Sequence, residues 1–304
     1  MRALFSVIKK GRGKMEKAKV YFTSEVSKDS LVKMYEALGV ELPGKVAVKL
    51  HSGEHGNKNY LKPDFVEALV KRVNGTVVEC NTAYPGERDT TEKHRHLMDE
   101  HEWTKYFDVD IMDSEGPDMV LDIPNGQQIK KNYVGKHLAN YDSMLVLSHF
   151  KGHAMGGFGG ALKQLSIGCA SSHGKAYIHG AGDAEADMWK TDQLQFVTSM
   201  GDAASSVHKY FDGKIVYVTA MVNISVDCDC DGNAAPPCME NIGILSSTDP
   251  VAIDQACIDI IYNSKDKGKE QLIARIEEKL GVNIIRVAEE DGAGTREYEL
   301  INVD

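Results

Sequence analysis

Residues 144–163 read MLVLSHFKGHAMGGFGGALK, and this stretch decides the predicted fold. The apolar run from Met144 to Leu147 predicts a buried strand, and two histidines and five glycines follow it directly. In open α/β sheets, ligands bind outside the carboxyl ends of the strands, and glycines there let the backbone approach a ligand closely. A helix over 160–169 would aim its free N–H groups at the same point, where a phosphate or carboxylate is stabilised. The stretch therefore predicts a ligand site whose cofactor-binding residues include Gly156, Gly157, Gly159 and Gly160.

A glycine-rich turn with surface histidines is the alternative interpretation of this stretch. The dinucleotide fingerprint is incomplete, because Ala161 and Leu162 stand where its third glycine is required.

Short apolar runs alternate with amphipathic stretches along the rest of the chain, which is typical of a parallel sheet covered by helices. The predicted strands are 20–23, 45–50, 76–80, 109–112, 119–123, 143–148, 214–222, 242–245 and an edge strand over 296–303. The predicted helices are 29–38, 63–73, 92–106, 160–169, 191–211, 250–262 and 269–280. We expect an α/β fold with two interleaved lobes on mostly parallel sheets flanked by helices, a cleft between the lobes and a crossover near 123–140. Residues 1–14 are interpreted as a non-native or upstream extension before a domain over 15–304.

The composition favours a small-molecule partner. The chain of 304 residues has 45 acidic and 35 basic side chains, a net charge of −10, which argues against a nucleic-acid partner. No apolar run approaches the roughly 18 residues of a membrane-spanning helix, and the apolar part of the first 14 residues is too short for a secretory signal. We therefore expect a cytoplasmic protein that binds a small anionic metabolite.

Three of the six cysteines cluster in one segment, at Cys228, Cys230 and Cys238. A Cys-x-Cys pair can present two sulfurs to one soft ion, such as iron, nickel or zinc, or to an iron-sulfur cluster. The flanking aspartates raise the energy of the thiolates unless a cation neutralises them. The alternative is a polar turn with small buried thiols, and the regular ferredoxin run is absent. The remaining cysteines lie in apolar contexts typical of core packing.

Four loop histidines and one lysine strengthen the prediction of a site. A single loop histidine is more often structural, but four histidines lie at predicted strand ends, namely His51, His55, His149 and His153, and Lys163 lies between these and His179, which follows the predicted helix 160–169. Such a group favours metal binding or proton transfer. We assign His51, His153 and Lys163 to catalysis, and we assign the metal to His149, Cys228 and Cys230.

Several motifs resemble one known family, the domain of unknown function 362. The resemblance rests on SHFKGH (148–153), GGFGGALKQL (156–165), CDC (228–230) and IGILSSTDPVAID (242–254). Members of this family are often labelled iron-sulfur-centre proteins, and many carry an inserted ferredoxin-like module. This chain has GDAEAD at 182–187 in the expected place of that module. The resemblance therefore implies a metal-linked protein, and it leaves the iron-sulfur label open for this chain.

A more remote resemblance is to the nickel-pincer lactate racemases. His153 stands ten residues before Lys163, and His179 stands sixteen residues after it, in a layout similar to theirs. The resemblance implies that His153 is an acid/base, that Lys163 anchors a cofactor and that His179 binds its metal. The Asp-x-Thr-Arg loop of that family is replaced by HSGEH at 51–55.

Three functions are consistent with these patterns. The first is a metal-dependent enzyme, an isomerase or oxidoreductase, that acts on a small anionic metabolite by acid/base or redox chemistry. The second is a non-catalytic metal-binding or electron-transfer accessory protein with a redox partner protein. The third is a lactate-racemase-like isomerase.

Overall fold

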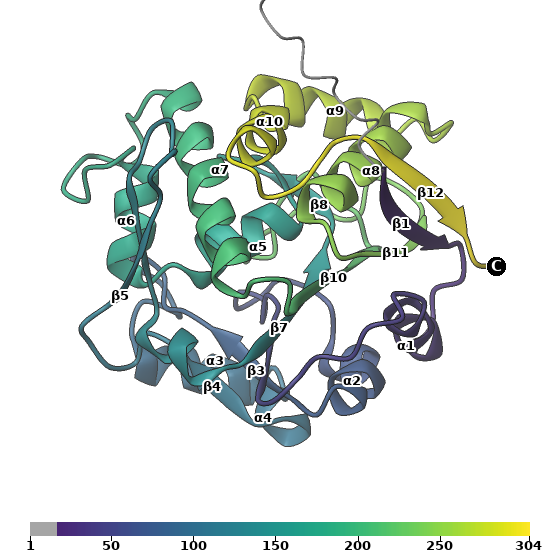
Figure 1. The fold of residues 1–304 in the computed structure, drawn as a ribbon, viewed down its shortest axis with the longest axis horizontal. Helices are drawn as coiled ribbons and strands as arrows, with labels where there is room; N and C mark the ends of the chain where they lie inside the picture. The colour runs from purple at the N-terminus through teal and green to yellow at the C-terminus, as the bar shows by residue number, and fades with distance from the viewer. Residues whose placement is uncertain (1–16) are drawn as a thin grey trace, which may run out of the picture.

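A mixed sheet of eight strands forms the centre of the molecule in the computed structural model, which describes residues 17–304 (Figure 1). Its strands are β1 (Ala18–Thr23), β2 (Val46–Lys49), β3 (Gly75–Glu79), β4 (Val109–Ile111), β7 (Ser143–His149), β10 (Ile215–Met221), β11 (Gly243–Ser247) and β12 (Tyr298–Asn302). Their order is β12-β1-β11-β10-β7-β2-β3-β4. Five of the seven pairings are parallel, and β11 runs antiparallel to both β1 and β10. The predicted α/β class with a mostly parallel sheet is therefore confirmed.

Helices cover both faces of this sheet, which explains why its central strands are continuously apolar. One face packs against α1 (Lys28–Glu36), α2 (Pro63–Arg72), α3 (Thr91–Glu100) and α4 (Trp103–Tyr106). The other face packs against α5 (Ala161–Cys169), α7 (Gln193–Tyr210), α8 (Pro250–Asn263), α9 (Lys269–Glu278) and α10 (Val282–Glu290). Alternate side chains of β7 enter the two cores, Met144 on one side and Leu145 on the other.

Two small hairpins extend the fold beyond the main sheet. β5 (Met119–Asp122) pairs with β6 (Lys131–Val134), and β8 (Lys151–His153) pairs with β9 (Gly157–Gly159). The predicted crossover segment 123–140 forms β6 and the 3-10 helix η1 (Lys136–Asn140). The main strands form one continuous sheet, and it is not divided into the two lobes that we expected.

The predicted helix over 92–106 is wrong in one respect, because it is two helices. Glu102 adopts a left-handed backbone with φ of 63° between α3 and α4. The ring nitrogen of His101 lies 2.9 Å from the Ser52 carbonyl oxygen, and the Trp103 indole N–H donates to the same oxygen. The break thus turns both side chains onto the loop after β2.

Residues 1–14, interpreted above as an extension, lie outside the described residues. Of the helices within residues 17–304, none is long and apolar enough to cross a membrane.

Candidate functional site

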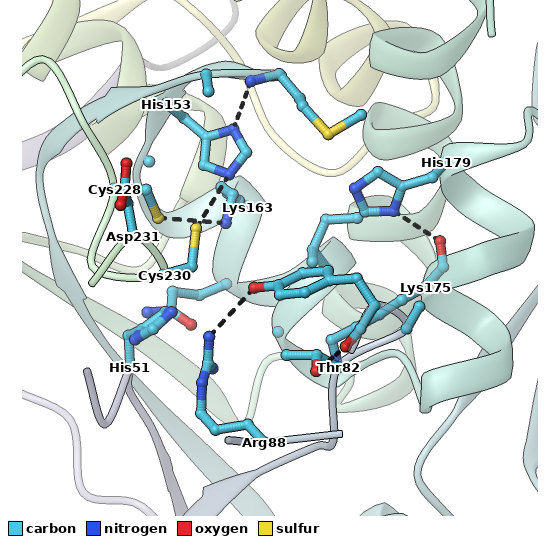
Figure 2. Close-up of a pocket in the computed structure, with 18 of the residues that line it drawn as sticks. His51, Thr82, Arg88, His153, Lys163, Lys175, His179, Cys228, Cys230 and Asp231 are labelled. Atoms are coloured by element: carbon cyan, nitrogen blue, oxygen red, sulfur yellow. Dashed lines mark hydrogen bonds between the residues drawn. The ribbon is translucent and has the colours of Figure 1, made fainter. Parts of the chain in front are cut away.

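A cavity of about 300 Å³ lies at the carboxyl ends of the central parallel strands (Figure 2). Its walls come from the loops after β2, β3 and β10, from the β8–β9 hairpin, and from α5 and α6 (Ser172–His179). The cavity is therefore built where open α/β sheets bind ligands. Most of the predicted site residues line it, namely His51, His153, Gly159, Gly160, Lys163, His179, Cys228 and Cys230.

Cys228, Cys230 and His153 form a compact group of metal-ligating side chains. Their ligand atoms all lie within 4.8 Å of one another. The Cys230 sulfur is 3.7 Å from Nε2 of His153, and Nζ of Lys163 is 4.0 Å from the Cys228 sulfur. These three side chains form a possible metal site. Cys238 lies outside this group, because its thiol donates to the Ile224 carbonyl oxygen at 3.3 Å.

The two thiols of this group have different acidities. Burial disfavours the thiolate of Cys228, but its hydrogen bond to Cys230, the nearby charge of Lys163 and the hydrogen-bonding His153 ring hold its pKa well below the usual value. The pKa of Cys230 is raised well above the usual value by its hydrogen bond to Cys228 and by burial. One thiolate is therefore stabilised at neutral pH, and thiolates are the form of cysteine that binds metals.

His153 and His179 both leave Nε2 free of backbone contacts, but this nitrogen differs in protonation between the two rings. Nδ1 of His153 accepts the backbone N–H groups of Met155 and Gly156 at 3.1 and 2.9 Å, so the neutral ring carries its proton on Nε2, beside Cys230. Nδ1 of His179 faces the Lys175 carbonyl oxygen at 2.7 Å and must donate to it, which leaves Nε2 with a lone pair. Metal-binding histidines are usually oriented in the second way.

Burial lowers the pKa of both rings. For His179 the pKa falls to about 4, so its ring is neutral at pH 7. His153 is thus arranged as a proton donor and His179 as a lone-pair donor.

His51, the third predicted catalytic residue, also lines the cavity. Its Nδ1 accepts the backbone N–H of Gly53 at 3.0 Å, so Nε2 carries the proton of the neutral ring. Burial and the charge of Arg88 lower its pKa well below the usual value. The ring is therefore neutral at pH 7.

His149 was predicted as a metal ligand, but both of its ring nitrogens already have partners in the protein. Its Nδ1 lies 2.9 Å from the Asp229 carboxylate, and its Nε2 lies 2.6 Å from the Val222 carbonyl oxygen. Both ring nitrogens therefore face acceptors, and neither offers a lone pair to an ion. Asp229 also binds the Lys151 ammonium at 2.6 Å, and all three side chains are buried. His149 and Lys151 thus position the loop that carries Cys228 and Cys230.

The free N–H groups at the start of α5 are already occupied by the protein. The backbone N–H groups of Ala161 and Leu162 donate to the Asp254 carboxylate at 2.8 and 2.9 Å. A Cβ atom on Gly160 would lie only 2.5 Å from that carboxylate. The expected anion at this helix end is therefore a side chain of α8 and not a ligand.

The other predicted cofactor-binding glycines contact neighbouring parts of the protein, and each does so in a different way. Gly157 has φ of +80°, and a Cβ there would lie 2.9 Å from the Cα of Gly281. Gly156 supplies a backbone N–H to His153. Gly159 lines the cavity next to Lys151, with 3.0 Å between its hypothetical Cβ and the lysine Cε. The glycine run thus shapes the β8–β9 hairpin and only partly faces the cavity.

Sequence reasoning missed four basic residues that line the cavity: Lys49, Arg88, Lys151 and Lys175. The only local signal was a lysine inside an apolar strand, Lys49 in VAVKL. A lysine there is fully buried and therefore requires a partner.

The fold and the cavity define an α/β protein with a possible His/Cys metal site at the carboxyl ends of its parallel strands. The chain belongs to the DUF362 family, described as a domain of unknown function, whose model matches residues 46–259. No curated protein sequence matches the chain.

The chain is similar to several solved structures, among them the following two. One is the lactate racemase apoprotein from Thermoanaerobacterium thermosaccharolyticum, with 14% sequence identity and a TM-score of 0.44. The alignment covers 79% of this chain and 56% of that one, so the chain spans little more than half of the racemase. The other is a protein from Thermotoga maritima, with 11% identity and a TM-score of 0.42, over 86% of this chain and 58% of that one.

Proposed function

We propose that this protein binds one soft metal ion through Cys228 and Cys230 and acts on a small organic anion in the adjoining cavity. The observation that carries the proposal is the sulfur pair itself, since the Cys228 and Cys230 sulfurs and Nε2 of His153 lie within 4.8 Å at the wall of a cavity rich in basic residues. Two thiolates suit zinc, nickel or iron better than hard cations such as magnesium.

The donor set fits a single ion better than an iron-sulfur cluster. Clusters are usually held by four cysteine thiolates, whereas within residues 17–304 only two cysteines contribute to this group. Cys238 has its thiol directed to a backbone carbonyl instead. A bound ion would supply Lewis-acid or redox chemistry beside the cavity.

His153 supports acid/base chemistry rather than a permanent ligand role. Its Nδ1 already accepts two backbone N–H groups, so a metal on Nε2 would require a ring stripped of both protons. As a proton donor and acceptor it lies 3.7 Å from the Cys230 sulfur at the cavity wall. His179 presents its lone pair to the same cavity and is available as a further ligand or as a base.

A substrate anion would be held by the basic lining of the cavity. The two alternatives remain an accessory metal-binding protein with a redox partner, and a racemase-like isomerase in which Lys163 anchors a cofactor. The accessory alternative predicts metal binding with no effect of organic anions, and the isomerase alternative predicts a covalent adduct on Lys163.

The test is metal analysis of protein purified without oxygen. We expect a metal close to stoichiometric in the native protein and in Cys238→Ser, a matched cysteine control outside the group. We expect its loss in the Cys228→Ser/Cys230→Ser double variant. Equal metal content in the double variant and the control would refute the proposal that Cys228 and Cys230 bind the metal.

His153→Gln separates the two roles of that residue. We expect this variant to keep its metal and to lose proton exchange, measured by NMR as deuterium incorporation into lactate and related hydroxy acids in D₂O. Loss of the metal in His153→Gln would make His153 a ligand and contradict the proton-transfer role. Intact mass of the native protein tests for the adduct on Lys163.

A further inference from the structure

Five basic side chains line the cavity, and three of them form ion pairs with carboxylates. The three pairs are Lys49 with Glu79, Arg88 with Glu54, and Lys151 with Asp229, while the Lys163 ammonium lies 4.0 Å from the sulfur of Cys228. Lys175 differs from the other four, because its ammonium contacts neither a carboxylate nor a thiol in the described part of the chain.

The ammonium of Lys175 is buried and incompletely bonded. The residue is 6% exposed, and its Nζ donates to the Ala170 carbonyl oxygen at 2.6 Å. An ammonium has three N–H donors, so two of them have no acceptor within residues 17–304. A buried charge without a partner is strongly unfavourable in a closed protein interior.

Two carboxylates, those of Asp113 and Glu79, act on the charge of Lys175, but both are already bonded to other groups. Asp113 accepts the backbone N–H groups of Asn81 and Ser172, each at 2.9 Å. Glu79 binds the Lys49 ammonium at 2.6 Å and the backbone N–H of Ser52 at 2.9 Å. The two free N–H donors of Lys175 are therefore available to something that enters the cavity.

We propose that Lys175 binds the carboxylate of a small organic acid. Two free N–H donors on one positive charge match the two oxygens and the single charge of a carboxylate, whereas a phosphate group brings a charge near −2 at pH 7. A cavity of about 300 Å³ lies at the small end of the range for ligand pockets.

This site would set the direction in which the ligand lies. Lys175 and His179 lie across the cavity from Cys228 and Cys230 in Figure 2. An organic acid held at Lys175 would therefore extend its remaining atoms toward the sulfur pair. This inference deepens the proposed function, because it names the class of the anion that would react there.

The experiment uses metal-free protein, so that metal binding does not enter the result. The probes are propionate and, separately, inorganic phosphate, and the readouts are the shift in melting temperature and ligand-observed NMR. Lys175→Gln keeps a donor for the Ala170 carbonyl and removes the charge, Lys175→Met removes both, and Lys131→Met removes an exposed charge from β6 as the matched control.

We expect propionate to stabilise the native protein and Lys131→Met, and to bind Lys175→Gln at least about tenfold more weakly, as expected for loss of a charge-assisted hydrogen bond. Equal propionate binding by native protein and Lys175→Gln would overturn the proposal. Stabilisation by phosphate and not by propionate would overturn the carboxylate assignment. If Lys175→Met does not fold, Lys175→Gln alone decides the result.

Failure of this inference can be told apart from failure of the proposed function. The Cys228→Ser/Cys230→Ser variant keeps Lys175, so we expect it to bind propionate as tightly as the metal-free native protein. Propionate binding in a native protein that takes up no metal would support the carboxylate site and refute the metal site.

Discussion

Replacing Lys49 with Met tests whether the floor of the cavity depends on a buried ion pair. The Lys49 side chain is fully buried, and its ammonium lies 2.6 Å from the Glu79 carboxylate, which is 3% exposed. Although burial opposes ionisation, the charge of Lys49 holds the pKa of Glu79 far below its usual value. Removing Lys49 therefore leaves a buried carboxylate whose hydrogen bonds from Ser52 remain but whose counter-charge is gone.

The expected loss follows from this geometry. Removing one partner of a buried pair costs about 3–5 kcal/mol of unfolding free energy. The unfolding entropy of a 304-residue chain is about 0.6 kcal/mol/K, so the melting temperature should fall by about 5–8 °C. The Lys49→Met/Glu79→Gln double variant removes both charges and keeps an acceptor for the Ser52 N–H. We expect it to be more stable than either single variant.

Chemical denaturation and thermal melts of the four proteins provide the measurement. The deficit of Lys49→Met should also shrink in acid, because Glu79 without its counter-charge can take up a proton in the folded state. Additive losses, with the double variant less stable than the native protein by the sum of the two single losses, would refute the reasoning. So would a loss below about 1 kcal/mol in Lys49→Met, since that is the range of an exposed pair.

Three further predictions concern single groups around the site. Burial raises the pKa of Asp254 to about 7, so the folded state holds a proton that the unfolded chain releases between about pH 4 and 7. The unfolding free energy of the native protein relative to Asp254→Asn should therefore decrease as pH rises through that window, and a pH-independent difference in urea melts would contradict this. Asp229→Asn removes the carboxylate shared by His149 and Lys151, so we expect the metal to be lost while circular dichroism still shows the α/β fold; retained metal would show that the loop does not need this anchor. Lys163→Met should change stability by less than about 0.5 kcal/mol and weaken the binding of lactate by about tenfold. Equal lactate-induced thermal shifts in both proteins would show that Lys163 takes no part in binding the anion.

Much of the main sheet could be predicted because its signals are local. β7 and α8 lie within one residue of their predicted bounds, and Asp249 caps α8 by accepting the N–H groups of Val251 and Ala252. The β8–β9 hairpin was missed because its glycines show no alternation of apolar and polar residues. The start of α9 was predicted and its end, at Glu278, lies two residues earlier than predicted. The helix α10 was not predicted, since Leu280 turns the chain with a left-handed φ of 52° before this second helix begins.

The candidate site was only partly predictable, because the role of a histidine depends on what its two nitrogens contact. His149 was predicted as a ligand from its place at a strand end, and His179 from the resemblance to the lactate racemases, sixteen residues after Lys163. The structure directs both nitrogens of His149 to acceptors 73 and 80 residues away in the chain. It directs only one nitrogen of His179 to an acceptor, four residues back in its own helix. Contacts across such separations have no signature in the order of the residues.

The same limit applies to the anion predicted at the glycine loop. The start of α5 does bind a carboxylate, but that carboxylate belongs to Asp254, 93 residues after Ala161. Once the protein fills this position, a ligand anion must be bound by a cation that the fold leaves unpaired. Among the basic residues of the cavity, ion pairs remove Lys49, Arg88 and Lys151 from consideration, and the Lys163 ammonium faces the Cys228 sulfur at 4.0 Å. We therefore place the proposed ligand site at Lys175 on α6 and not at the backbone of the glycine loop, because the pairing of charges in three dimensions decides which cations remain free to bind a ligand.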